Sequence, residues 1–179
     1  MIDTEKKALR KKIKAIKSEV SFEEKKTRSK NILLKLERNK IFQNAKIVML
    51  YWSMKDEVFT HDFVVKWSSD KKIILPSVAG DNLILKEFTG KDDLVAGDRY
   101  DIPEPGCGIF ENENEIELIV VPGVAFDKQN NRMGRGKAYY DKLLKSTKAK
   151  KIGICFEFQL FENIPYDKYD VKMDLVISE

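Results

Sequence analysis

The chain has 179 residues, of which 42% are hydrophobic, with 33 lysines and arginines against 29 acidic residues. This size suits one folded unit, so we expect a single domain over residues 1–179. No apolar run is long enough to span a bilayer and no signal segment opens the chain, so we expect a cytoplasmic protein without a membrane partner. Two distant cysteines and one histidine do not have the spacing of a zinc or iron–sulfur centre.

Two amphipathic helices open the chain. Apolar residues recur at helical spacing over residues 4–20, which predicts a helix there. Residues 21–24 form a capping-box pattern, which predicts the start of a second helix. Ile32, Leu33 and Leu36 would form the inward face of that helix.

From residue 46 onward, short apolar strands alternate with helical or loop segments. The predicted strands are residues 47–52, 73–75, 118–121, 152–155 and 175–177. Residues 83–88 predict an extra strand, which leads into an irregular stretch over residues 97–114. The alternation predicts an α/β fold, in which helices cover a mostly parallel sheet.

The segment Asn131–Asp141 combines cations, glycines, tyrosines and a carboxylate in one loop-to-helix junction. It follows the buried strand at residues 118–121, which ends at Pro122-Gly123. The pattern from Ala138 onward allows an amphipathic helix, so the preceding residues would lie at a helix N-terminus, where free N–H groups attract anions. We therefore expect ligand chemistry just after this strand.

The side chains of this junction suit a nucleotide phosphate. Gly134 and Gly136 let the backbone approach a ligand closely and adopt left-handed torsions. Arg132, Arg135 and Lys137 supply charge that phosphate oxygens can share. The spacing of the glycines differs from that of a Walker A loop. A solvated basic loop that caps a helix is the alternative interpretation of the same residues.

The longer pattern resembles the signature of the 5-formyltetrahydrofolate cyclo-ligase family. The signature is formed by Val121–Asp127 and then Arg132–Asp141. Further matches follow the family's order along nearly the whole chain: Lys6-x-x-x-Arg10, Asp56-Glu57-Val58, Ile74-Leu75-Pro76, Ile102–Pro105, Gln159, Asp170-Val171 and Asp174. The resemblance implies a three-layer α/β/α fold like that of sugar-phosphate isomerases and coenzyme A transferases, with N-terminal helices packed on the sheet.

The resemblance also implies an activity. Family members convert 5-formyltetrahydrofolate to 5,10-methenyltetrahydrofolate with ATP and Mg²⁺, through a phosphorylated formyl (imidate) intermediate, and release ADP and phosphate. The implied partners are small molecules, a reduced folate and ATP, with no nucleic acid, and the implied state is a monomer. Two alternatives stay open: an RNA-binding module that uses the basic segments, and a relative that keeps the nucleotide site but takes another substrate.

Site roles follow from the resemblance, residue by residue. The ATP-binding residues would be Lys6, Arg10, Arg132, Met133, Gly134, Arg135, Gly136, Lys137 and Tyr140. Lys137, Arg135 and Tyr140 would be catalytic, and Glu57, Tyr100 and Tyr140 would hold the folate. Asp141 and Asp174 would be magnesium ligands.

The sequence departs from the family pattern at two positions. Tyr100 stands where some members carry a tryptophan near the pterin, and Ala138 replaces a glycine. His61, the only histidine, receives no role, and Trp52 is expected to be a core residue.

Overall fold

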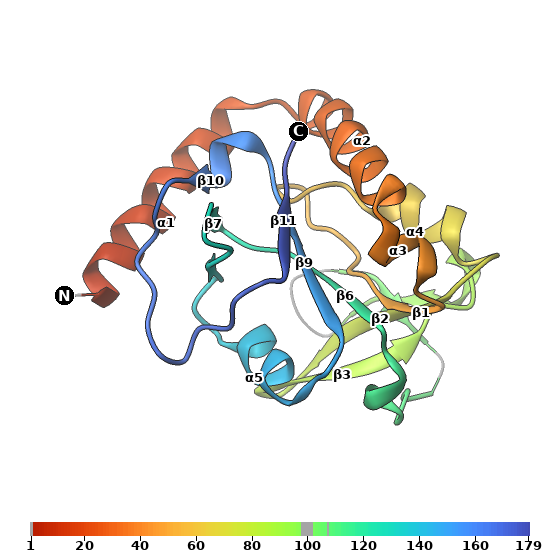
Figure 1. Cartoon of the computed structure of the whole chain (residues 1–179). Helices are drawn as coiled ribbons and strands as arrows, with labels where there is room; N and C mark the ends of the chain where they lie inside the picture. Colours follow the sequence, from red (N-terminus) through yellow and green to blue (C-terminus); the bar gives the residue numbers. More distant parts are fainter. Residues whose placement is uncertain (1, 98–101, 107) are drawn as a thin grey trace.

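The centre of the molecule is a six-stranded sheet (Figure 1). The computed structural model describes residues 2–97, 102–106 and 108–179. In sheet order the strands are β11 (Leu175–Ile177), β9 (Lys150–Ile154), β6 (Leu118–Val121), β1 (Ile47–Met49), β2 (Lys72–Ala79) and β3 (Asn82–Glu87). All neighbouring strands are parallel except β2 and β3, which pair antiparallel. The predicted mostly parallel sheet and the extra strand are therefore confirmed.

The strand residues explain why the sheet lies in the core. All four residues of β6 are buried, as expected for a parallel strand covered on both faces. In β1, Val48 and Met49 point to opposite faces and join different hydrophobic clusters. The strand predicted over residues 47–52 is shorter in the structure: β1 ends at Met49, and the Leu50 N–H makes one further hydrogen bond to the Ile74 carbonyl at 2.9 Å.

Helices cover the two faces of the sheet unequally. The helices are α1 (Ile2–Glu19), α2 (Phe22–Arg38), α3 (Lys40–Asn44), α4 (His61–Trp67) and α5 (Tyr139–Ser146). Residues of α2, α3 and α4 pack on one face, and α5 packs on the other. The predicted start of the second helix is confirmed, since the Ser21 hydroxyl accepts a hydrogen bond from the Glu24 N–H at 3.1 Å.

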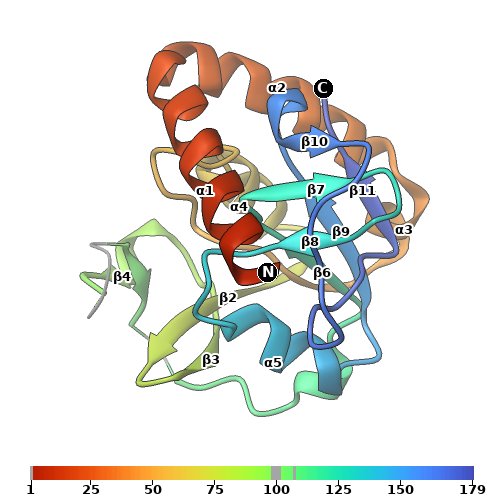
Figure 2. The same cartoon turned by 90° about the vertical axis from the view of Figure 1, so that its left-hand side faces the viewer.

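A second, three-stranded sheet was not predicted. It is formed by β7 (Ala125–Asp127), β8 (Arg132–Met133) and β10 (Leu160–Phe161). Arg132 and Met133 therefore lie on a strand and not in the loop expected for them. Figure 2 shows α1 running beside this sheet, where Leu9 packs against Ala125 and Met133.

The remaining elements are short. They are the strand pair β4 (Leu94–Val95) and β5 (Glu104–Pro105), and the 3₁₀ turns Lys91–Asp93, Glu113–Glu115 and Glu157–Gln159. Among the helices of the described residues, none has the length and apolar character needed to cross a membrane.

Candidate functional site

A pocket of about 150 Å³ opens beyond the carboxyl ends of β1 and β6, where open α/β sheets bind ligands. Its walls come from segments that are distant in the sequence. The lining residues are Tyr51, Trp52, Met54, Glu57, Pro76, Val78, Leu83, Ile102, Pro122, Gly123, Arg132, Gly134, Arg135, Lys137, Ala138, Tyr139, Tyr140 and Asp141. Most of the predicted site residues are thus gathered around one cavity.

The glycine-rich loop at residues 134–138 leads into α5, as predicted. A side chain at Gly134 would place its Cβ only 2.9 Å from a guanidinium nitrogen of Arg132, so close packing requires glycine there. Gly136 has a φ of +99°, which only glycine adopts easily. Ala138 has a φ of 55° and a ψ of 16°, so an alanine occupies the left-handed region directly before α5.

Arg132 is a buried part of the wall. Its Nε donates to the Pro122 carbonyl at 2.9 Å, and its Nη1 contacts the Asp141 carboxylate at 3.1 Å. The guanidinium lies 5.3 Å from the centre of the Tyr140 ring. Burial lowers the pKa of Arg132, and the negative charge of Asp141 opposes this shift. Arg132 therefore fixes the end of β6, the loop and the first turn of α5 relative to one another.

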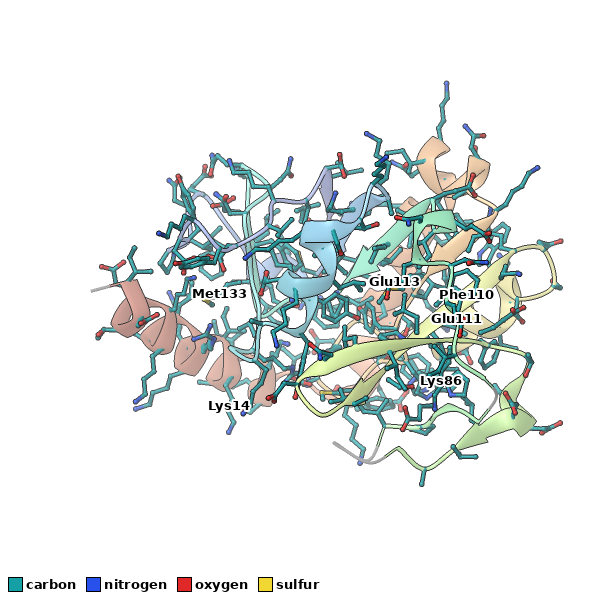
Figure 3. All side chains as sticks on the ribbon, turned by 90° about the horizontal axis from the view of Figure 1, so that it is seen from below. Lys14, Lys86, Phe110, Glu111, Glu113 and Met133 are labelled. Atoms are coloured by element: carbon teal, nitrogen blue, oxygen red, sulfur yellow. The ribbon has the colours of Figure 1, made fainter. Side chains whose placement is uncertain are left out.

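Met133 points away from the pocket. Its side chain is buried with Ala125 and Ile164 beside α1 (Figure 3). Its carbonyl accepts a hydrogen bond from the Val124 N–H at 2.8 Å. The Met133 side chain does not line the pocket.

Lys6 and Arg10 reach the site from α1, on one helix face as predicted. The Lys6 ammonium contacts Asp167 at 2.7 Å and Asp170 at 2.6 Å, and the Arg10 Nε donates to the Gly134 carbonyl at 2.9 Å. Burial disfavours the charged form of Lys6, but the two carboxylates outweigh it and raise its pKa. Both cations are thus already engaged by the protein, and phosphate at Lys6 would compete with carboxylates.

Arg135 is exposed and lines the pocket. One of its terminal nitrogens contacts Asp56 at 2.8 Å and Glu57 at 3.2 Å. Asp56 also pairs with the buried ammonium of Lys17 at 3.4 Å. Desolvation opposes ionisation of Asp56, but the charges of Lys17 and Arg135 outweigh it and hold its pKa below the ordinary value. Asp56 matched the family pattern without an assigned role, and Lys17 was not identified from the sequence.

The side chain of Lys137 is exposed and borders the pocket. In the part of the chain that the structure describes, it makes no ion pair or hydrogen bond, unlike Arg132 and Arg135. Tyr140 lines the same pocket, and burial raises the pKa of its hydroxyl well above the ordinary value, so the phenol stays protonated. Tyr100 lies outside the described residues.

An aromatic wall was missed at the sequence level. Trp52 was expected in the core, but it borders the pocket and stacks on His61, with ring centres 4.1 Å apart. The His61 Nε2 is 2.9 Å from the Ser53 carbonyl, which fixes the ring. The position of Trp52 at the end of the predicted first strand, on the expected active edge of the sheet, was the available signal.

Asp141 and Asp174 are not brought together. Asp174 accepts a hydrogen bond from the Lys151 N–H at 2.8 Å, at the amino end of β9. Asp141 contacts Arg132 at the carboxyl edge of the sheet. The length of the strands separates the two carboxylates, so they do not share one ion in this structure. Asp170 pairs with Lys6 at 2.6 Å and does not line the pocket.

An aromatic pocket bordered by a cationic glycine-rich loop, at the carboxyl edge of a parallel sheet, is typical of α/β enzymes that bind small ligands. The family model of the 5-formyltetrahydrofolate cyclo-ligase family matches residues 2–179, and the chain belongs to this enzyme family.

Relatives align over most of the chain. The Mus musculus protein named 5-formyltetrahydrofolate cyclo-ligase is 29% identical over 194 aligned residues, which cover 99% of this chain and 95% of that protein. The solved structure of Aquifex aeolicus 5,10-methenyltetrahydrofolate synthetase is 35% identical, with a TM-score of 0.86 and coverage of 97% of this chain and 89% of that one. The Mycoplasma pneumoniae synthetase is 30% identical, with a TM-score of 0.77 and coverage of 96% and 97%.

Proposed function

We propose that the protein converts 5-formyltetrahydrofolate to 5,10-methenyltetrahydrofolate, using ATP and releasing ADP and phosphate. One observation carries this proposal: the cationic loop and the folate-side carboxylate lie within contact distance, since Arg135 and Glu57 are 3.2 Å apart. A ligand phosphate on the loop and a reduced folate against Glu57 would therefore be neighbours. Family membership supplies the identity of the substrates.

The proposed reaction requires that the protein hold the two substrates in position and neutralise charge on the transferred phosphoryl group. The formyl oxygen attacks the γ-phosphorus, ADP leaves, and the formyl carbon becomes part of a phosphorylated imidate. The neighbouring folate nitrogen then attacks that carbon, the ring closes and inorganic phosphate departs. Negative charge develops on the transferred phosphoryl group, so fixed cations stabilise the transition state. Lys137 and Arg135 are the loop cations that would supply this charge.

The pocket walls suit the proposed folate. Trp52 and Tyr140 give the cavity two aromatic sides, against which a flat heterocycle packs favourably. The Glu57 carboxylate is held in place because its Oε2 accepts a hydrogen bond from the Met54 N–H at 3.0 Å. A carboxylate fixed in this way can accept hydrogen bonds from the N–H groups of a pterin ring. The protonated hydroxyl of Tyr140 adds a donor.

Magnesium fits the site only together with phosphate. Asp141 lines the pocket and contacts Arg132 at 3.1 Å. Over the described residues, no group of three or more histidine, cysteine or acidic side chains is arranged to hold a metal ion. Phosphate oxygens would therefore have to complete the coordination. Bound there, Mg²⁺ would neutralise triphosphate charge, and Asp141, which lines the pocket, would be its protein ligand.

The direct test mixes purified protein with 5-formyltetrahydrofolate, ATP and Mg²⁺ and follows the near-ultraviolet absorbance of the methenyl product, with ATP omitted as the control. An ATP-dependent rise is expected. Folded protein that binds ATP but gives no rise would refute the proposed reaction and favour a relative with another substrate.

A variant tests the role of the loop. Lys137→Ala should lower kcat by about 100-fold or more, the usual cost of removing one group that stabilises transition-state charge. Lys145→Ala, which removes an exposed lysine from α5, the helix that follows the loop, is the matched control and should retain activity. Unchanged melting temperatures would separate this effect from misfolding. Normal turnover by Lys137→Ala would exclude the assigned role.

A further inference from the structure

Arg135 and Glu57 occupy each other in the described state. The contact of 3.2 Å joins a cation assigned to phosphate with a carboxylate assigned to folate. Each side chain would therefore have to release the other before both substrates can be held. The two binding sites are thus linked through one ion pair, an inference that rests on the proposed function.

We propose that nucleotide phosphates draw Arg135 away from Glu57 and so open the folate site, which makes binding of the two substrates mutually favourable. In this scheme Asp56 and Lys17 are positioning residues that hold Arg135 while the nucleotide site is empty.

The relative strengths of the two contacts favour the transfer of Arg135 from the carboxylates to phosphate. The Arg135 side chain is 46% exposed, and such partly exposed ion pairs contribute little stability. A charge-assisted, bidentate contact between arginine and phosphate is stronger. The neighbouring Gly134 and Gly136 give the backbone around Arg135 freedom to follow the side chain. Phosphate can therefore compete successfully for this guanidinium.

The remaining partners stay in place when Arg135 leaves. Asp56 retains Lys17, whose ammonium lies 3.4 Å from its other carboxylate oxygen, so the charge of Asp56 is still compensated. Glu57 retains the hydrogen bond from the Met54 N–H, so its carboxylate remains at the pocket wall while Oε1 becomes available. Release of Arg135 therefore leaves Glu57 in place with a free carboxylate oxygen, which can accept a hydrogen bond from the folate.

Movement of Arg132 or Lys6, the two buried cations near the loop, would not release Glu57. Arg132 is 5% exposed on its side chain and is tied to Asp141 and the Pro122 carbonyl. Lys6 is 8% exposed on its side chain and contacts two carboxylates, neither of which lines the pocket. In the described chain, Arg135 is therefore the cation whose movement changes the state of Glu57.

Binding measurements test the coupling without relying on turnover. Calorimetric titration of 5-formyltetrahydrofolate into the full chain is compared with and without a non-hydrolysable ATP analogue and Mg²⁺. We expect the nucleotide to increase folate affinity by at least about fivefold, the lower end of usual coupling between sites, with the same factor for the reverse order. If Arg135 had only a structural role, the nucleotide would not increase the affinity for folate.

Variants locate the coupling. Arg135→Gln should bind folate without nucleotide more tightly than the unmodified protein does, because Glu57 is already released. In Asp56→Asn, only one carboxylate holds Arg135 near Glu57. The nucleotide should therefore increase folate affinity by a smaller factor than in the unmodified protein. Lys66→Gln removes an ion pair of 2.6 Å with Glu37 away from the pocket and should leave the factor unchanged.

Failure of this inference can be distinguished from failure of the proposed function. If both substrates bind but the nucleotide leaves folate affinity unchanged or lowers it, the coupling is refuted and the proposed reaction stands. Folate binding by Arg135→Gln that is no tighter than normal without nucleotide also refutes it. If 5-formyltetrahydrofolate does not bind under any condition, the proposed function is refuted together with the coupling.

Discussion

Ala138→Gly should stabilise the protein, because Ala138 adopts a φ of 55° directly before α5. The left-handed region costs a non-glycine residue about 1–2 kcal/mol, whereas glycine costs about 0.5–1 kcal/mol more backbone entropy on folding. The difference favours glycine by about 0.5–1 kcal/mol. The side chain of Ala138 is exposed, so its removal leaves no cavity in the core.

The expected change is measurable by thermal unfolding. For a chain of this size, 1 kcal/mol shifts the melting temperature by about 2–4 °C, so Ala138→Gly should raise it by about 1–4 °C. The control is Ala8→Gly, at an exposed position inside α1, which should lower stability by about 1 kcal/mol. If Ala138→Gly lowered the melting temperature as Ala8→Gly is expected to do, the left-handed torsion of Ala138 would not destabilise the protein by the amount given above.

Two further predictions concern protons and magnesium. Burial lowers the pKa of His61 below 6.5, so the unfolded chain takes up its proton first and stability should fall as pH drops below 6.5. Urea unfolding between pH 7.5 and 5 should show this fall, and His61→Gln should flatten it; an equal slope in both proteins would contradict the assignment. Asp141→Asn should raise the Mg²⁺ concentration needed for half-maximal activity, whereas Asp174→Asn should not. A shift for Asp174→Asn alone would overturn the placement of the ion.

The sequence predicted the elements that depend on local pattern. Apolar spacing within α1 and α2 and the continuous apolar run of β6 are local signals, and the structure confirms all three. The glycines of the loop were predicted to adopt left-handed torsions, and Gly136 does so with a φ of +99°, whereas the predicted close approach to a ligand stays a prediction. Each of these features is set by steric and hydrophobic preferences that act within a few residues.

The small sheet could not be predicted in the same way. Its strands β8 and β10 contain two residues each, too few to show a period. They pair with β7, and β10 lies more than 30 residues away from it along the chain. As a result Arg132, expected in an exposed loop, is a buried side chain between Pro122 and Asp141.

By itself the sequence determined the α/β class, the family signature and the set of residues that carry charge at the site. Only the tertiary structure decided how those charges pair. Lys6 meets Asp170 across 164 residues and Arg135 meets Glu57 across 78, and no local pattern encodes such contacts. The same folding places Asp174 at the opposite end of the strands from the pocket. The sequence specifies the chemistry of each side chain, but the distances between side chains are set only when the sheet and helices pack.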